Sequence, residues 1–102
     1  MNRLTDVDGR TLRLTDERLV HIERRPEMVG QFTRIEETLA APDEIRASNH
    51  DDEVRLYYRH YPETPVTEKY LLVVARLDDD PFVITAFFTD RIKSGQPIDP
   101  GP

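Results

Sequence analysis

The sequence predicts an α+β domain in which two short N-terminal helices are followed by an antiparallel sheet. Three observations predict this class. Apolar residues recur at helical spacing between residues 28 and 39, and aromatic or β-branched residues dominate the segments from 54 to 89. Clusters of Asp, Pro and Gly separate these segments. The chain has 102 residues, the size of one domain, and no cysteine, which excludes disulfides and a cysteine nucleophile.

The first elements are predicted from short local signals. Residues 11–14 alternate polar and apolar side chains after an Asp-Gly pair, which predicts a short strand. Thr15 precedes two acidic residues, a pattern typical of a helix start. Leu19 and Ile22 mark the buried face of this helix, and Pro26 ends it.

The second helix has the clearest periodicity in the chain. Its apolar positions recur at spacings of four, three and four, at Met28, Phe32, Ile35 and Leu39. The helix is expected to end before Pro42, because the residue before a proline avoids the helical region.

Everything downstream is expected to form strands, at residues 44–47, 54–61, 70–77 and 82–89. The run from Tyr70 to Leu77 is almost continuously apolar, which indicates a central strand covered on both faces. Residues 1–94 are expected to form the single domain. Residues 95–102 are rich in proline and glycine and are expected to form a flexible or extended tail.

The charge balance limits the classes of partner. Twenty Asp and Glu residues against fourteen Lys and Arg residues give a net charge of −6, which argues against capture of nucleic acid over a broad surface. Twelve of the fourteen cations are arginine, whose planar fork suits phosphate, so a local basic cleft is still compatible with the composition. No apolar run is long enough to cross a bilayer, so a cytoplasmic protein without a membrane partner is expected. Known cofactor and metal motifs are absent, and neither a cofactor nor a metal is expected.

His21 is the first candidate for chemistry. It lies within the first predicted helix, just before Glu23, Arg24 and Arg25. A histidine beside arginines could serve as a general acid or base while an arginine stabilises charge on a phosphate. The competing interpretation is a histidine on the surface of a helix.

The strand predicted at 54–61 carries the second candidate set. Alternation places Arg55, Tyr57, Arg59 and Tyr61 on one face. Such a face could stack bases and hold phosphates, as recognition of single-stranded RNA requires. It could equally be a solvated sheet face with cross-strand aromatic pairs.

The last predicted strand and the residues that follow it supply the third set of candidate residues. Thr85 interrupts an otherwise apolar strand, and Arg91 and Lys93 follow its end. Thr85 could present its hydroxyl to a phosphate or act as an ordinary strand former, and the two cations could bind phosphate or serve solubility.

The stretch from Leu14 to Met28 resembles the opening helix of phage-associated nucleases of the Barnase, EndoU, colicin and RelE-like class. The resemblance continues through a Pro-Asp pair at 42–43, a Tyr-Tyr-Arg strand at 57–59, a Val-Ile-Thr-Ala-Phe strand at 83–87 and the basic segment Arg-Ile-Lys-Ser-Gly at 91–95 that follows this strand. It covers roughly residues 11–95. Directly before Pro26 the family pattern has a second histidine, where this chain has Arg25.

The resemblance implies two helices packed on a four- to five-stranded antiparallel sheet, with RNA bound in the cleft between sheet and helix. It also implies metal-independent RNA cleavage, in which the ribose 2′-hydroxyl attacks the adjacent phosphate. His21, Arg24 and Thr85 would match catalytic positions of the family, and Lys93 would match a basic position in the segment after its last strand.

The functional hypothesis is therefore an endoribonuclease or a ribonuclease-like toxin. RNA, with tRNA among the candidates, would be its substrate, and an antitoxin or another protein would be its partner. His21, Arg24 and Thr85 would act in catalysis, and Tyr57, Arg59, Arg91 and Lys93 would bind substrate. One alternative is a non-catalytic protein- or RNA-binding module derived from that fold. Another is a structural domain without a site.

Overall fold

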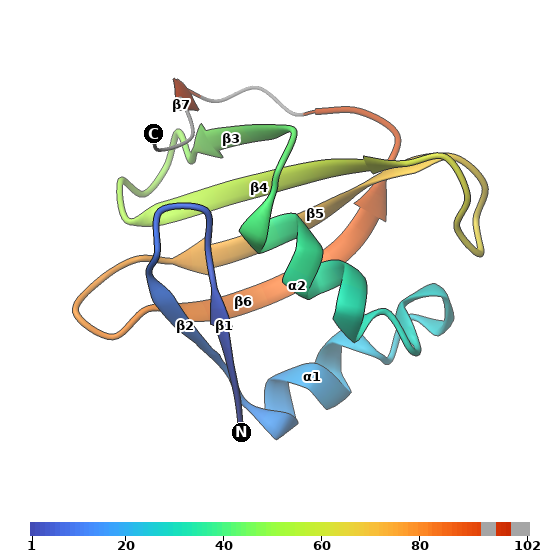
Figure 1. Ribbon diagram of the computed structural model, residues 1–102, viewed down its shortest axis with the longest axis horizontal. Helices are drawn as coiled ribbons and strands as arrows, with labels where there is room; N and C mark the ends of the chain where they lie inside the picture. The colour runs from blue at the N-terminus through green and yellow to red at the C-terminus, as the bar shows by residue number, and fades with distance from the viewer. Residues whose placement is uncertain (93–95, 99–102) are drawn as a thin grey trace.

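The computed structural model describes residues 1–92 and 96–98, which form a seven-stranded sheet with two α-helices (Figure 1). The helices are α1 (Asp16–Ile22) and α2 (Phe32–Ala40), and a 3₁₀ turn, η1 (Pro26–Met28), lies between them. The strands are β1 (Asn2–Thr5), β2 (Thr11–Leu14), β3 (Glu44–Ala47), β4 (Val54–Tyr61), β5 (Lys69–Arg76), β6 (Phe82–Thr89) and β7 (Gln96–Ile98). No helix in the described part of the chain has the length and apolar character of a membrane span.

The sheet is mixed, so the prediction of a purely antiparallel sheet of four or five strands is wrong. The strand order is β1-β2-β6-β5-β4-β3-β7, and β2 and β6 run parallel where Arg13 lies opposite Phe82. All other neighbours are antiparallel. The five predicted strands are present, but β1 and β7 add two more. β1 is short and polar, and β7 falls in the predicted tail, so neither has a local signal of its own; each forms by pairing with a neighbouring strand.

The β1–β2 hairpin closes through a turn built around a buried carboxylate. Asp6 Oδ1 accepts hydrogen bonds from the backbone N–H groups of Asp8 at 3.0 Å and Arg10 at 2.9 Å. Gly9 has φ of +87°, in the left-handed region that glycine enters without steric cost. The hairpin places β2 beside β6 and directs the chain into α1 (Figure 1).

The start of α1 and the end of α2 lie where the sequence predicts, but α1 ends at Ile22 rather than at Pro26. Thr15 caps α1 by accepting a hydrogen bond from the N–H of Arg18 at 3.1 Å, and α2 ends at Ala40, just before Pro42. The placement of Met28 on the second helix is wrong. Met28 belongs to η1, because the chain turns at Gly30 with φ of +78° before α2 starts at Phe32.

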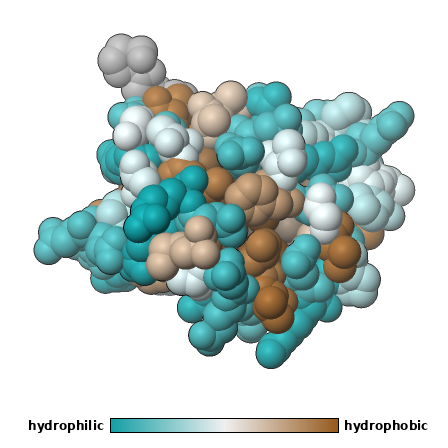
Figure 2. All heavy atoms as spheres, turned by 60° about the horizontal axis from the view of Figure 1, so that its bottom comes forward, coloured by the Kyte–Doolittle hydropathy of each residue, from teal (hydrophilic) through white to brown (hydrophobic). Residues whose placement is uncertain are grey.

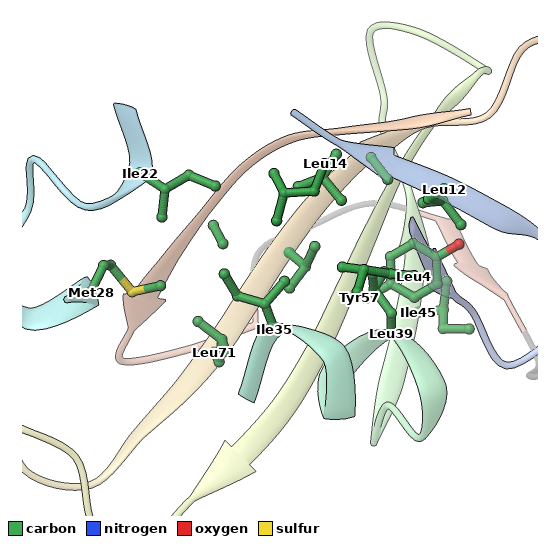
Figure 3. Packing of buried hydrophobic residues seen from close by; sticks show 14 of the residues in the cluster. Leu4, Leu12, Leu14, Ile22, Met28, Ile35, Leu39, Ile45, Tyr57 and Leu71 are labelled. Carbon is green, nitrogen blue, oxygen red and sulfur yellow. The ribbon is translucent and has the colours of Figure 1, made fainter. Parts of the chain in front are cut away.

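The core lies between the sheet and the helices. Figure 3 shows Leu12 and Leu14 of β2, Ile22 and Met28 from the α1–η1 region, Ile35 and Leu39 of α2, and Tyr57 and Leu71 of the central strands converging on one cluster. α2 crosses one face of the sheet, whereas α1 packs along β6 (Figure 1).

Among the described residues, no helix covers the opposite face of the sheet. Cross-strand register places Tyr58, Leu72 and Phe87 in one row on this face, and Val74 and Thr85 in the next. Tyr58 and Leu72 are 0% and 2% exposed although they lie outside the main cluster. The apolar run of β5 is therefore buried on both faces at its centre.

Candidate functional site

His21 lies in the last turn of α1 and is exposed to solvent. It lines a surface hollow of about 490 Å³ together with Thr15, Glu17, Arg18, Val20 and Arg24. The α-helical repeat groups Glu17, Arg18 and His21, because residues three or four apart lie side by side on a helix. Arg24 lies in the turn just after α1, where its N–H donates to the carbonyl of His21 at 3.3 Å. Glu17 precedes His21 by four positions, and Arg24 follows it by three. The structure therefore brings together two of the predicted catalytic residues, His21 and Arg24.

The charge of this hollow favours an anion. Arg18 and Arg24 have no ion pair within residues 1–92 and 96–98, so their guanidinium groups have donors to offer a ligand. Glu17 carries the only negative charge among the described side chains that line the hollow. Two arginines beside a histidine form a local basic site on a chain whose net charge is −6.

A second hollow, of about 220 Å³, adjoins the first. It is lined by Arg13, Thr15, Arg18, Phe82 and Val83, so it shares Thr15 and Arg18 with the hollow of His21. The parallel pairing of β2 with β6 creates it by placing Arg13 opposite Phe82. Arg13 Cζ lies 6.0 Å from the centroid of the Phe82 ring, and Arg13 Nε donates to Asp80 Oδ1 at 2.8 Å.

Apolar surface accompanies these charges. Val20, which lines the first hollow, is 60% exposed, and Val29 after η1 is 61% exposed. Figure 2, in which the bottom of Figure 1 comes forward, shows apolar side chains gathered in the middle of this face among hydrophilic ones. The face that carries α1 therefore combines cationic and apolar groups.

Arg25, at the position where the resemblance in the sequence implies a second histidine, is directed toward β6. Its Cζ lies 5.0 Å from the centroid of the ring of Phe87 on β6, the strand against which α1 packs. A cation in this position is attracted to the face of the aromatic ring. Arg25 therefore joins the segment after α1 to the helix-free face of the sheet.

Thr85 does not line either hollow. It lies on the helix-free face of β6, opposite Val74, and is partly exposed. Arg91 is exposed just after β6, where its carbonyl accepts a hydrogen bond from Thr89 Oγ1 at 3.3 Å, and it also lines neither hollow. Lys93 lies outside the described residues.

The Arg/Tyr face of β4 points toward α2 rather than into solvent. Tyr57 is 1% exposed, and its hydroxyl donates to Asp6 Oδ2 at 2.8 Å. Its ring therefore offers no free face on which a base could stack, and Tyr57 is not included in the candidate site. Arg59 Nη1 donates to the carbonyl of Ala41 at 2.6 Å. Tyr61 is packed between Arg59 and Arg34, whose Cζ atoms lie 5.7 and 4.6 Å from its ring centroid. These contacts join β4 to α2.

Seven residues that line the two hollows were not among the predicted site residues: Arg13, Thr15, Glu17, Arg18, Val20, Phe82 and Val83. Glu17 and Arg18 had a usable signal, because they precede His21 by four and three positions on a predicted helix. Arg13 and Phe82 had none, since the two positions meet only through a parallel strand pair between distant segments.

Comparison with known proteins gives one result. No curated protein and no solved structure matches the chain significantly. The model of a protein family, described as phage-Barnase-EndoU-ColicinE5/D-RelE like nuclease2, matches residues 2–99. The match spans every helix and strand in the described part of the chain, from β1 to β7, and agrees with the resemblance seen in the sequence. The chain therefore belongs to this family and is a nuclease-type domain.

Proposed function

We propose that this nuclease-type domain is an endoribonuclease that cleaves RNA without a metal ion, using the hollow of α1 as its centre. The observation that carries the proposal is the grouping of His21, Glu17, Arg18 and Arg24 around one hollow of the surface. This set contains two groups able to transfer protons and two cations able to hold a phosphate.

RNA carries its own nucleophile, the ribose 2′-hydroxyl. In the proposed reaction one side chain removes the proton of this hydroxyl, and its oxygen forms a bond to the adjacent phosphorus. The bond from phosphorus to the 5′ oxygen of the next nucleotide breaks, and a second side chain donates a proton to that leaving oxygen. The products are a 2′,3′-cyclic phosphate and a free 5′-hydroxyl.

The two proton transfers are assigned to His21 and Glu17. An imidazole can serve as acid or base near neutral pH. The Glu17 carboxylate can take the proton of the 2′-hydroxyl, while protonated His21 donates a proton to the leaving 5′ oxygen. Both side chains line the same hollow, one helical turn apart.

Arg18 and Arg24 are assigned to the phosphate. The transition state places additional negative charge on the non-bridging oxygens, and guanidinium donors already in place stabilise that charge. A metal ion is not required in this scheme, because side chains perform both the proton transfers and the stabilisation of charge.

The test is incubation of the purified protein with total cellular RNA and with a single-stranded RNA oligonucleotide in EDTA. His21→Ala is compared with His50→Ala, a matched control because His50 is also exposed but lies in the turn between β3 and β4. Fragments with cyclic phosphate ends from the wild type and His50→Ala, but not from His21→Ala, would support the proposal.

Two results would oppose it in different ways. Full cleavage by a folded His21→Ala protein would remove the assigned mechanism while leaving a ribonuclease. Intact RNA with all three proteins, each shown to be folded by circular dichroism, would remove the ribonuclease assignment and favour a binding module.

A further inference from the structure

The hollow beside Phe82 is not used by the chemistry assigned above. It contains an aromatic ring with a guanidinium group near it, 6.0 Å from Arg13 Cζ to the ring centroid, and it opens beside Arg18. Phe82 is partly exposed although it is a large apolar residue at the start of β6. A partly exposed ring next to cations is the combination that binds nucleobases by stacking.

We propose that this hollow is a base-binding subsite, which takes one unpaired nucleobase of the RNA next to the phosphate held at α1. The inference rests on the proposed function for the position of that phosphate. At about 220 Å³ the hollow is smaller than the roughly 300–1,000 Å³ of pockets that enclose a drug-sized ligand. Its size suits a single planar ring lying on the surface.

The connection between the two hollows sets the geometry of the substrate. Thr15 and Arg18 line both, so a nucleotide can place its base against Phe82 while its phosphate reaches Arg18. The Thr15 hydroxyl already accepts the capping hydrogen bond from the Arg18 N–H, but its proton is free to be donated to the nucleotide. Arg18 is then the residue that connects base binding to the reaction centre.

One acidic group borders this subsite. Asp80 accepts a hydrogen bond from Arg13 Nε at 2.8 Å and is largely exposed. The pair holds the Arg13 guanidinium near the Phe82 ring and neutralises part of its charge. Stacking, rather than attraction of a phosphate, is therefore the main contribution of Arg13 and Phe82.

Stacking on Phe82 selects the class of RNA. In a duplex both faces of each base are covered by its neighbours, and the A-form helix presents mainly phosphates and 2′-hydroxyls. A base can enter the hollow only when it is unpaired, in a single strand, a loop or a bulge. The substrate class is therefore RNA with an unpaired nucleotide at the cleaved position, and stacking alone tolerates any base.

The test measures binding, so that it does not depend on cleavage. A fluorescent pentanucleotide of RNA is titrated with His21→Ala protein, with and without Phe82→Leu. Leucine keeps an apolar side chain at this position and removes the ring. Tyr70→Leu is the matched control, because Tyr70 is a partly exposed aromatic residue on the same sheet that lines neither hollow.

We expect Phe82→Leu to weaken binding of the single strand about tenfold, within the range measured for loss of one base–aromatic stack, and Tyr70→Leu to leave it unchanged. A second ligand tests the same contact independently of any misfolding of the Phe82→Leu protein. An oligomer of the same length without bases should bind the parent and Phe82→Leu proteins equally, because only the bases contact the ring. Annealing the pentanucleotide within a longer duplex should also abolish the effect of Phe82→Leu.

Equal binding of the single strand by the parent and Phe82→Leu proteins would overturn the subsite, as would a Phe82 effect that persists with the oligomer without bases. These outcomes are separate from a failure of the proposed function. Cleavage by the wild type without a Phe82 effect would leave the ribonuclease and remove the subsite. A Phe82 effect without any cleavage would leave the subsite on a non-catalytic RNA-binding domain.

Discussion

The Tyr57 hydroxyl donates a hydrogen bond of 2.8 Å to Asp6, which joins the middle of β4 to the turn between β1 and β2. The Asp6 side chain is fully buried and also pairs with Arg10 Nη1 at 3.0 Å. Burial by itself would raise the pKa of Asp6, but the hydrogen bonds from Tyr57 and Arg10 outweigh it and lower the pKa below its ordinary value. Tyr57, predicted to bind substrate, instead fastens the N-terminal hairpin to the sheet.

Tyr57→Phe should destabilise the fold. The substitution leaves a buried carboxylate without one of its donors, and a hydrogen bond to a charged group contributes about 1.5–3 kcal/mol. We expect the free energy of unfolding in urea to fall by about 2 kcal/mol. Tyr70→Phe is the control, since within the described residues the Tyr70 hydroxyl has no hydrogen bond; it should change stability by less than about 0.5 kcal/mol. Equal effects of the two substitutions would show that the hydroxyl of Tyr57 does not stabilise the hairpin.

Stability should fall in acid partly through Asp6. Because folding lowers the pKa of Asp6, the unfolded chain binds this proton more readily. The stabilisation is therefore complete above the unfolded value of about 3.9 and is lost as the pH falls through the lower folded value. Asp6→Asn should be less stable at pH 7 and should lose less stability between pH 5 and pH 2. Urea unfolding of both proteins across this range measures how the free energy of unfolding of each one depends on pH.

Asp51 and Asp90 serve as an internal reference for that comparison. Hydrogen bonds from the Glu53 backbone and Arg76 lower the pKa of Asp51, and a hydrogen bond from Lys69 lowers the pKa of Asp90. Both carboxylates remain in Asp6→Asn, so that variant should keep part of its acid dependence. Identical slopes for the two proteins would contradict the contribution assigned to Asp6.

Gly30→Ala should destabilise the link between η1 and α2. Gly30 has φ of +78°, and a Cβ built there meets no atom within 4 Å, so the cost lies in the backbone rather than in a steric clash with neighbours. Left-handed backbone costs an ordinary residue about 1–2 kcal/mol, and asparagine tolerates it better. We expect thermal unfolding to rank the proteins as wild type, then Gly30→Asn, then Gly30→Ala. A Gly30→Ala protein as stable as the wild type would show that this turn can change conformation freely.

The salt dependence of RNA binding should identify the phosphate contacts. Each contact with a phosphate of a single strand contributes a slope of about −0.7 to the dependence of log K on log salt concentration. Arg18→Gln and Arg24→Gln should each reduce the slope by about this amount. Arg3→Gln, which removes an exposed cation on β1, should leave it unchanged. If all three variants changed the slope equally, the basic hollow at α1 would have no special part in binding.

The candidate site was partly predictable, because its central residues are close to one another in the sequence. His21 lies on a helix whose N-cap, Thr15, is visible in the sequence, and Arg24 follows in the turn just after that helix, where its N–H donates to the His21 carbonyl at 3.3 Å, so their proximity follows from local structure. The face assigned to Arg55, Tyr57, Arg59 and Tyr61 was also correct as an alternation. Its orientation toward α2 was not predictable, since a period of two gives two faces and does not say which one the helices cover.

The sequence by itself determined the nuclease family, the five main strands, the start of α1 and the end of α2, because these depend on side-chain patterns and capping groups within short segments. Only the tertiary structure decided that β1 and β7 form, that β2 and β6 run parallel, and that Arg13 faces Phe82 beside the hollow of His21. These features depend on hydrogen bonds and packing between segments up to about seventy residues apart. Such pairings are chosen by the free energy of the whole sheet, and no single segment contains that information.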